Sequence, residues 1–468
     1  MQQNYEYGMI GLGTMGRNLV LNMNDHGFSV MGYDRNEAQV KTLLDEGSGR
    51  TVSATTKIEA FIAALKTPRV ILMLVPAGKI VDQVISELLP LLSANDMIID
   101  CGNSHFTDTD RRNTQLAGSG IHFMGTGVSG GESGARYGPS IMPGGDKQAY
   151  ERVSAMFASI AAKVNDEPCV TWLGPGSAGH YVKMVHNGIE YGIMQLIAET
   201  YHLLKKIAGM NNDELHDLYT GWDEGRLHSF LVEITAKIFK QQDDLGSNRL
   251  VDRILDSAQQ KGTGGWASED AMNLQVPIPV IDIAVAMRDL SANKADREAL
   301  QQKGGSTNAA ITMSKDELVP RLEQALYFSV IIAYTQGMAL MQAASKAYSY
   351  ELDLKNIASI WRGGCIIRSS LLDDIYAAYA KQPALANLLL DDDIAGKLRQ
   401  TQEATRYIIQ TAINAGIPVP GMMASLSYYD SYHCGWLPAN LLQAQRDYFG
   451  AHTYQRNDRE GTFHTHWQ

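Results

Sequence analysis

The first third of the chain alternates short apolar runs with amphipathic segments. Apolar runs at residues 7–10, 29–33, 69–75 and 97–100 have the length of buried strands. The segment 17–23, directly after the first run and its turn, has a helical pattern instead. Because strands that alternate with helices form parallel sheets, we expect an N-terminal doubly wound α/β domain of Rossmann type.

From residue 180 onward the pattern changes to long amphipathic segments with few strand signals, for example 194–208, 319–345 and 392–414. This change predicts a large all-helical second domain. We therefore expect three units, a dinucleotide-binding domain (1–178), an all-helical domain (179–436) and a C-terminal tail (437–468). The tail carries aromatic residues, arginine and histidine, so we expect it to dock onto another surface.

The turn after the first apolar run has the pattern G-x-G-x-x-G, with glycines at Gly11, Gly13 and Gly16. Gly11 permits the tight turn, Gly13 lets a pyrophosphate approach the backbone, and Gly16 permits close packing of helix and strand. The following helix N-terminus presents free N–H groups to the phosphates. The cofactor-binding turn predicted here also contains Leu12, Thr14 and Met15.

The second strand ends at Asp34, Arg35 and Asn36, where the adenosine ribose of a dinucleotide is expected. An acidic residue at this position is typical of NAD sites and an arginine is typical of NADP sites, so these residues conflict. Loops after later strands face the same crevice and contain Val75, Pro76, Ala77 and Asn103. Asn103 is a candidate contact to substrate or to the nicotinamide ribose, and a plain turn role for it is equally consistent.

A second glycine-rich stretch, residues 125–134, is predicted to be a loop. It is either a flexible turn or, with Gly130 and Gly131 beside Ser129, a set of backbone N–H groups for a carboxylate or phosphate.

The segment 179–191 places a base and an acid close together. In a helix, Lys183, His186, Asn187 and Glu190 stand at i, i+3, i+4 and i+7 and share one face. A lysine and a carboxylate that line one cleft suit proton transfer in two steps. The alternative is a solvated helix face with a single Lys–Glu pair.

Composition and charge narrow the classes of function. The formal net charge of −11 gives no support for a nucleic-acid partner. The sequence shows neither a signal peptide nor an apolar run long enough to cross a membrane. Four scattered cysteines predict free thiols, and His464 and His466 lack further ligands at metal-binding spacing. We therefore expect a cytoplasmic protein that binds no metal, nucleic acid or membrane.

At this point the motifs resemble those of a known family. The stretches are 11–19, 127–131, 183–191, 261–264 and 445–452. Together they resemble full-length 6-phosphogluconate dehydrogenases, and the resemblance covers essentially all 468 residues. It implies oxidative decarboxylation of 6-phosphogluconate to ribulose 5-phosphate and CO2, with reduction of NADP, in the pentose phosphate pathway and gluconate utilisation.

The resemblance also implies roles for individual residues. Lys183 is the base that accepts the proton of the 3-hydroxyl, and Glu190 is the acid that protonates C1 of the enediol. The sugar acid is held by Asn103, Ser129, Gly130, Gly131, His186 and Asn187. Its phosphate is held by Tyr191, Lys261, Thr263 and Arg288, completed by Arg446 and His452 from the tail of the other subunit in a homodimer.

The chain departs from the family pattern at three positions. Asp34 stands where NADP-using members commonly have asparagine, Pro76 replaces a lysine and Cys101 replaces a glycine. The resemblance and Arg35 favour NADP, and NAD or dual use stays open because of Asp34. Two rival interpretations are a dehydrogenase for an unphosphorylated 3-hydroxyacid and a non-catalytic coenzyme-binding sensor.

Overall fold

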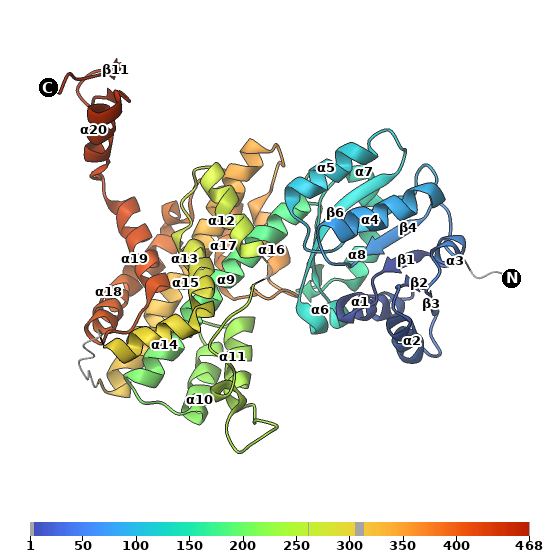
Figure 1. The fold of residues 1–468 in the computed structure, drawn as a ribbon, viewed down its shortest axis with the longest axis horizontal. Helices are drawn as coiled ribbons and strands as arrows, with labels where there is room; N and C mark the ends of the chain where they lie inside the picture. Colours follow the sequence, from blue (N-terminus) through green and yellow to red (C-terminus); the bar gives the residue numbers. More distant parts are fainter. Residues whose placement is uncertain (1–3, 261, 305–312, 468) are drawn as a thin grey trace.

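A computed structural model describes residues 4–260, 262–304 and 313–467. A sheet with helices on both faces forms the N-terminal part, and a large array of helices follows it, with a C-terminal arm that projects from the array (Figure 1). The predicted fold class, a Rossmann-type domain followed by an all-helical region, is confirmed.

The sheet has seven strands in the order β3-β2-β1-β4-β5-β6-β7, and only β7 is antiparallel to its neighbour. Its strands are β1 (Tyr7–Ile10), β2 (Val30–Tyr33), β3 (Val52–Thr55), β4 (Val70–Met73), β5 (Met97–Asp100), β6 (His122–Ser129) and β7 (Ser140–Pro143). The chain runs outward from β1 in both directions, so the strand order reverses between β1 and β4. Ligands bind at the carboxyl ends of the strands at such a switch point.

Alternating side chains of the strands pack against helices on opposite faces. In β4, Leu72 joins one apolar cluster with Leu19 of helix α1 (Thr14–Asp25), while Ile71 and Met73 join another with Val81 of helix α4 (Lys79–Leu88). Both faces are therefore buried, as expected for parallel strands. The helices of this part are α1 (Thr14–Asp25), α2 (Glu37–Glu46), α3 (Ile58–Ala63), α4 (Lys79–Leu88), α5 (Phe106–Leu116), α6 (Gly131–Tyr137), α7 (Lys147–Glu151) and α8 (Ser154–Ile160).

A small hairpin of β8 (Lys163–Val164) and β9 (Glu167–Pro168) leads to the helical region, whose axis is α9 (Ala178–Lys206). Helix α15 (Lys315–Ala347) packs beside α9, and both contribute to one large apolar core. The other helices are α10 (Asn212–Asp223), α11 (Phe230–Lys240), α12 (Thr263–Asn273), α13 (Pro279–Ala292), α14 (Lys294–Lys303), α16 (Leu354–Trp361), α17 (Leu371–Lys381), α18 (Asp392–Asn414) and α19 (Pro420–His433). Within the described ranges, no helix combines the length and hydropathy needed to cross a bilayer.

The first turns of α9 lie directly on β6 because glycines remove the intervening side chains. A Cβ atom on Gly127 would overlap the Cβ of Lys183, and one on Gly125 would lie 2.7 Å from Nδ1 of His180. The prediction that residues 125–134 form a loop was therefore wrong for 125–129, which belong to β6, and for 131–134, which belong to α6. These glycines make room for a helix, and only Gly130 and Gly131 adopt positive φ at the turn that follows.

The C-terminal arm consists of α20 (Ala439–Gly450) and a hairpin of β10 (Tyr454–Gln455) and β11 (Thr462–Phe463). Its centre is the buried carboxylate of Asp447, which accepts hydrogen bonds from the backbone N–H groups of Thr453 and Thr465. The indole of Trp467 and the ring of His464 contact the same carboxylate. Burial acts to raise the pKa of Asp447, but these hydrogen bonds outweigh it and lower the pKa.

We expect substitution of Gly16 to disturb the fold and substitution of Gly13 to leave it intact. A Cβ on Gly16 would overlap the carbonyl oxygen of Gly11, whereas a Cβ on Gly13 meets no atom within 4 Å. Gly16→Ala should lower the free energy of unfolding by about 1–3 kcal/mol, the usual cost of overpacking. Thermal unfolding of both variants measures the difference, and equal Tm values would contradict this account of the turn.

Candidate active site

Two cavities meet at the switch point of the sheet, at the carboxyl ends of β1 and β4. The larger has a volume of about 690 Å³ and the smaller about 340 Å³. Both are lined by Gly13, Leu74, Val75 and Pro76, so they form one continuous groove. The groove has the position and the elongated form that a dinucleotide requires.

The glycine turn Gly11–Gly16 forms the floor between the two cavities. Gly11 has φ of +90°, and a Cβ there would overlap the carbonyl oxygen of Leu74. The space beside Gly13 is open, and Thr14, Met15 and Gly16 line the larger cavity. Leu12 differs from the others, because its side chain is fully buried in the apolar core. The turn therefore fits a pyrophosphate at the first turn of α1.

The smaller cavity is lined by Asp34, Arg35 and Asn36, so the sequence-predicted ribose residues lie together. Both carboxylate oxygens of Asp34 accept backbone hydrogen bonds, Oδ2 from Leu12 and Oδ1 from Asn36, each at 2.8 Å. Nη2 of Arg35 lies 2.5 Å from Oε1 of Glu87 on α4, an ion pair that the sequence did not reveal. The cavity wall thus presents one carboxylate held by the backbone and one guanidinium shared with an acidic partner.

The larger cavity extends from the glycine turn to the helical region. Val75, Pro76, Ala77, Asn103 and Thr263 line it, as predicted candidates for coenzyme or substrate contact. His105, Asp108, Val128 and Trp266 line it as well and were not anticipated. The rings of His105 and Trp266 meet edge-on with centroids 4.9 Å apart, so α12 contacts the residue that precedes α5. The position of His105 at the cavity could have been predicted from the sequence, because His105 follows the loop after β5. No local sequence pattern distinguishes Trp266.

Lys183 and Glu190 lie in α9, as the helical spacing predicted. Lys183 is 7% exposed, and its side chain packs against Gly127, the neighbour of cavity residue Val128. Burial lowers the pKa of Lys183 below that of a lysine in water, although the Glu190 carboxylate acts in the opposite direction. Burial likewise raises the pKa of Glu190, while Lys183 and Arg288 oppose the shift. Both shifts favour the uncharged forms.

His186 connects α9 to the end of β6. Its Nε2 lies 3.1 Å from Oγ of Ser129, and its Nδ1 lies 3.2 Å from Oδ1 of Asn187. Because an amide oxygen only accepts, Nδ1 carries the proton and Nε2 accepts from the Ser129 hydroxyl. Burial and the nearby Lys183 hold the pKa of His186 well below 6.5, so the ring is neutral. Gly130 and Gly131 follow Ser129 in the turn, so the structure brings five of the six predicted sugar-acid contacts together at α9 and β6.

Tyr191 and Arg288 form the centre of a second cluster, at the opposite end of this helix face. The guanidinium carbon of Arg288 lies 3.4 Å from the ring centroid of Tyr191. Helix α12 packs beside them, because a Cβ on Gly264 would overlap the Tyr191 ring. Thr263 is the first residue of α12 and is buried. The predicted contact Lys261 lies outside the described residues.

Arg288 has donor capacity that the described side chains do not use. Its Nη1 is buried without a hydrogen-bond partner among the described residues, and Nη2 contacts only Sδ of Met194 at 3.6 Å. Burial lowers the pKa of Arg288, with Tyr191 and Glu190 opposing the shift. A desolvated guanidinium with an unsatisfied donor is suited to an anionic ligand.

The last two predicted phosphate contacts do not join this cluster within one chain. Arg446 lies on α20 and His452 lies just beyond it, both exposed on the projecting arm (Figure 1). Nη1 of Arg446 donates to Oε1 of Gln443 on the same helix. The structure therefore separates these residues from Tyr191, Thr263 and Arg288 of their own chain.

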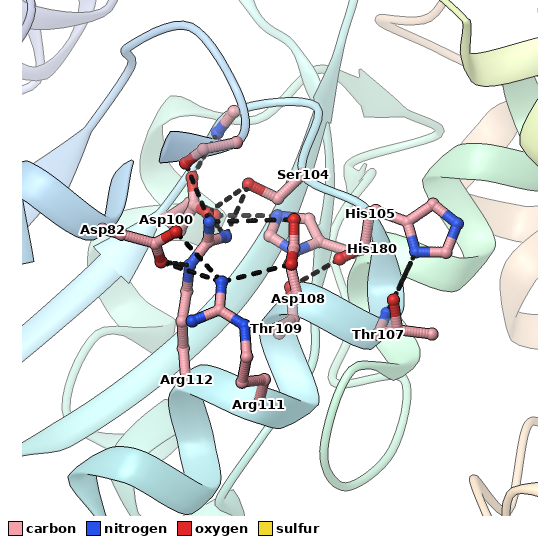
Figure 2. Close-up of polar contacts among 12 residues, drawn as sticks. Asp82, Asp100, Ser104, His105, Thr107, Asp108, Thr109, Arg111, Arg112 and His180 are labelled. Atoms are coloured by element: carbon pink, nitrogen blue, oxygen red, sulfur yellow. Dashed lines mark hydrogen bonds and ion pairs between the residues drawn. The ribbon is translucent and has the colours of Figure 1, made fainter. Parts of the chain in front are cut away.

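Sequence reasoning missed a buried ionic network behind the larger cavity. Figure 2 shows it around Arg112 of α5, which contacts Asp82, Asp100 and Ser104. Arg112 is 1% exposed and Asp100 is fully buried. The adjacent arginines at 111 and 112 were the available signal, but their pattern does not reveal which of the two is buried.

The fold and the groove define a dinucleotide-binding protein whose helical region supplies a buried lysine, a buried histidine and a partly buried glutamate. The NAD binding domain of 6-phosphogluconate dehydrogenase matches residues 6–174, and the C-terminal domain of 6-phosphogluconate dehydrogenase matches residues 179–467. The chain belongs to the 6-phosphogluconate dehydrogenase family.

Individual relatives resemble the chain over its full length. The NADP(+)-dependent, decarboxylating 6-phosphogluconate dehydrogenase of Bacillus subtilis (strain 168) is 51% identical over 463 residues, 99% of each chain. The decarboxylating 6-phosphogluconate dehydrogenase of Synechococcus elongatus is 51% identical over 466 residues, again 99% of each chain. A structure of the Plasmodium falciparum enzyme, studied with NADP+ and with 6-phosphogluconate, has a TM-score of 0.95 at 41% identity and covers 99% of this chain and 100% of its own.

We expect inorganic phosphate to stabilise the protein through Arg288. Phosphate at about ten times its dissociation constant should add about 1.4 kcal/mol to the free energy of unfolding. Arg288→Met should abolish this gain, because it removes the unsatisfied donor. Arg321→Met is a matched control, since Arg321 also stacks on a tyrosine, Tyr407, but donates to the carbonyl of Glu317. The measurement is thermal unfolding across a phosphate titration. An equal loss of the phosphate-dependent stabilisation in both variants would contradict a site at Arg288.

Proposed function

We propose that the protein is an NADP-dependent 6-phosphogluconate dehydrogenase that oxidises and decarboxylates 6-phosphogluconate to ribulose 5-phosphate and CO2. The observation that carries this proposal is a pair on one face of α9 beside the dinucleotide groove, the buried Lys183 and the partly buried Glu190. The names of the relatives and the match of both family domains agree with it.

Lys183 acts as the base in the first step. Bound NADP would supply the hydride acceptor for C3 of the substrate. Because burial lowers its pKa, Lys183 is available in the neutral form and its Nζ takes the proton of the 3-hydroxyl as C3 is oxidised to a ketone. The ammonium that forms then lies beside the new carbonyl oxygen.

The same groups complete the second step. The C1–C2 bond breaks and CO2 leaves. The electron pair of that bond is accepted by the C3 ketone while the Lys183 ammonium donates its proton to the ketone oxygen, which gives the enediol. Glu190 then donates a proton to the former C2 of the substrate, which is C1 of the enediol, and Lys183 takes back the enol proton as the product ketone forms. The raised pKa of Glu190 suits an acid that must hold its proton until this step.

The remaining site residues hold the substrate. We assign Asn103, Ser129, Gly130, Gly131, His186 and Asn187 to the carboxylate and hydroxyl groups. The phosphate is assigned to Tyr191, Thr263, Arg288 and Lys261, with Arg446 and His452 of a second subunit. A phosphorylated substrate also explains why a guanidinium with an unsatisfied donor is buried near the acid–base pair.

The groove residues support NADP, with NAD as a second coenzyme. Asp34 is the residue that would repel a 2′-phosphate, but backbone N–H groups from Leu12 and Asn36 hold both of its oxygens. Arg35 can turn from Glu87 toward a 2′-phosphate, because the side chain is 58% exposed. The Bacillus subtilis relative is NADP-dependent.

Steady-state kinetics with 6-phosphogluconate test the proposal directly. NADP and NAD are titrated separately while CO2 release is measured. Turnover with a larger kcat/KM for NADP supports the proposal, and turnover with a larger kcat/KM for NAD would reverse the coenzyme assignment. Coenzyme binding without CO2 release would favour a sensor or an unphosphorylated substrate.

We expect Lys183→Met to lower kcat by about 10²–10⁴-fold, the usual contribution of a general base, while coenzyme binding persists.

The rate depends on neutral Lys183, so kcat/KM falls as pH drops through the pKa of this lysine. At pH values where Glu190 is ionised, its carboxylate raises that pKa, so in Glu190→Gln the acidic limb should shift to lower pH. The turnover of the Glu190→Gln variant should fall as well, because this variant lacks the acid. A pH profile of both variants is the measurement, and an acidic limb shifted upward would contradict the pairing.

We also propose that the chain forms a homodimer in which the arm 437–468 docks on the partner, with 1–178 and 179–436 as the two domains of the body. Leu441, Leu442 and Phe449 on α20 are 60%, 63% and 73% exposed. Such an apolar surface on a projecting helix is typical of an interaction site. Arg446 lies on the same helix, so docking would bring a cation to the partner.

Truncation before Leu437 should therefore weaken both dimerisation and phosphate recognition. The truncated chain is expected to have a higher KM for 6-phosphogluconate and a smaller mass in sedimentation equilibrium. Arg446→Met should raise KM without altering mass, because it leaves the apolar surface in place. An unchanged KM in both variants would refute a role of the arm in the site.

A further inference from the structure

Arg112 is hydrogen bonded to both loops that flank the larger cavity. Its Nη2 donates to the carbonyl oxygen of Gly78 at 3.0 Å, in the loop between β4 and α4. Its Nη1 donates to Oγ of Ser104 at 3.2 Å, in the loop between β5 and α5 (Figure 2). Gly78 lines the cavity itself, and Asn103 beside Ser104 lines it as well. One buried side chain therefore spans the back of both loops.

Asp100 fixes the second loop at its base. Its Oδ1 accepts the backbone N–H of Gly102 at 3.0 Å, and its Oδ2 accepts the hydroxyl of Ser104 at 2.5 Å. Nη1 of Arg112 lies 3.6 Å from the same Oδ2. Because this carboxylate is fully buried, the nearby guanidinium is needed to compensate its charge.

His180 extends the network to the catalytic helix. Its Nε2 lies 3.0 Å from the backbone oxygen of Asp100, and its Nδ1 lies 2.7 Å from Oγ1 of Thr109. A carbonyl only accepts, so Nε2 carries the proton and Nδ1 accepts from Thr109. Burial lowers the pKa of His180, which keeps this arrangement neutral. His180 stands one turn before Lys183 in α9, so the chain of hydrogen bonds runs from both loops to the helix of the base.

We propose that Arg112 and His180 are positioning residues that set the distance between the nicotinamide and the substrate carbon held beside Lys183. This inference rests on the proposed function. With Asp34 at the adenosine end of the groove, the nicotinamide end occupies the larger cavity between the two loops. Hydride transfer requires reacting atoms about 3–3.5 Å apart, and a displacement of about 1 Å can cost about 10²-fold in rate.

Three variants test the role of the network. Arg112→Lys keeps the charge but cannot reach both loops and Asp82 with one ammonium group. Thr109→Val removes the hydroxyl that orients His180, and Thr109→Ser restores it. Arg111→Met is the matched control, because Arg111 also pairs with Asp82 and Asp108 but contacts neither loop.

The main readout is the primary isotope effect on kcat with substrate deuterated at C3. For Arg112→Lys we expect kcat to fall at least about tenfold, the isotope effect to increase, and KM for the substrate to change less than about twofold. Thr109→Val should shift kcat and the isotope effect in the same direction, with Thr109→Ser and Arg111→Met close to wild type. A lower kcat with an unchanged isotope effect would mean loss of folded enzyme only, and would overturn the proposal.

Two further measurements keep the outcomes separate. If Arg112→Lys does not fold, Thr109→Val decides alone, and an unchanged isotope effect in it overturns the proposal. If the wild type releases no CO2, the proposed function fails while NADPH binding still tests the network. Weaker NADPH binding in Arg112→Lys than in Arg111→Met then supports a role in shaping the cavity, and equal binding overturns it.

Discussion

The close contact between α9 and β6 is the constraint on which the rest of the site depends. Gly125 and Gly127 in the strand, and Gly179 in the helix, leave no room for a Cβ atom. The backbones therefore approach closely, and the stem of Lys183 lies against the sheet next to the wall of the coenzyme groove. A larger side chain in this contact would push the helix outward and move Lys183 with it. Packing of two elements thus determines where Lys183 lies relative to the groove.

The same contact determines the ionisation of the site. Lys183 and His186 are buried and Glu190 is partly buried, and for each of them desolvation is the largest cause of the pKa shift. Desolvation disfavours charge of either sign, so it shifts Lys183 toward its neutral form and Glu190 toward its protonated form on one helix face. Arg288 cannot respond by losing its proton, so its buried guanidinium keeps its charge and needs an anion. The ligand that completes the site must therefore bring negative charge.

Local patterns predicted those parts of the protein that depend on local interactions. The apolar runs 7–10 and 97–100 coincide with β1 and β5, and the segment 392–414 coincides with α18. The shared face of Lys183 and Glu190 followed from helical periodicity alone. Residues 125–129 were wrongly predicted to form a loop because glycine weakens the sequence signal of a strand. The glycines are needed here because helix α9, which is distant in sequence, packs directly on the strand. Trp266 and Arg112 were missed because their surroundings come from tertiary packing.

The C-terminal arm is folded by its own contacts, so the proposed docking on a partner would not require it to fold first. The hydrogen bonds to Asp447 come from residues 453–467, so the shape of the arm depends on its own residues and not on the body of the chain. A preorganised segment loses little conformational entropy when it binds, which leaves more of its apolar contact energy for association. Arg446 adjoins this carboxylate in the sequence and is held by the same helix. A folded arm therefore presents its cation in a defined position, as the recognition of a phosphate in a neighbouring subunit would require.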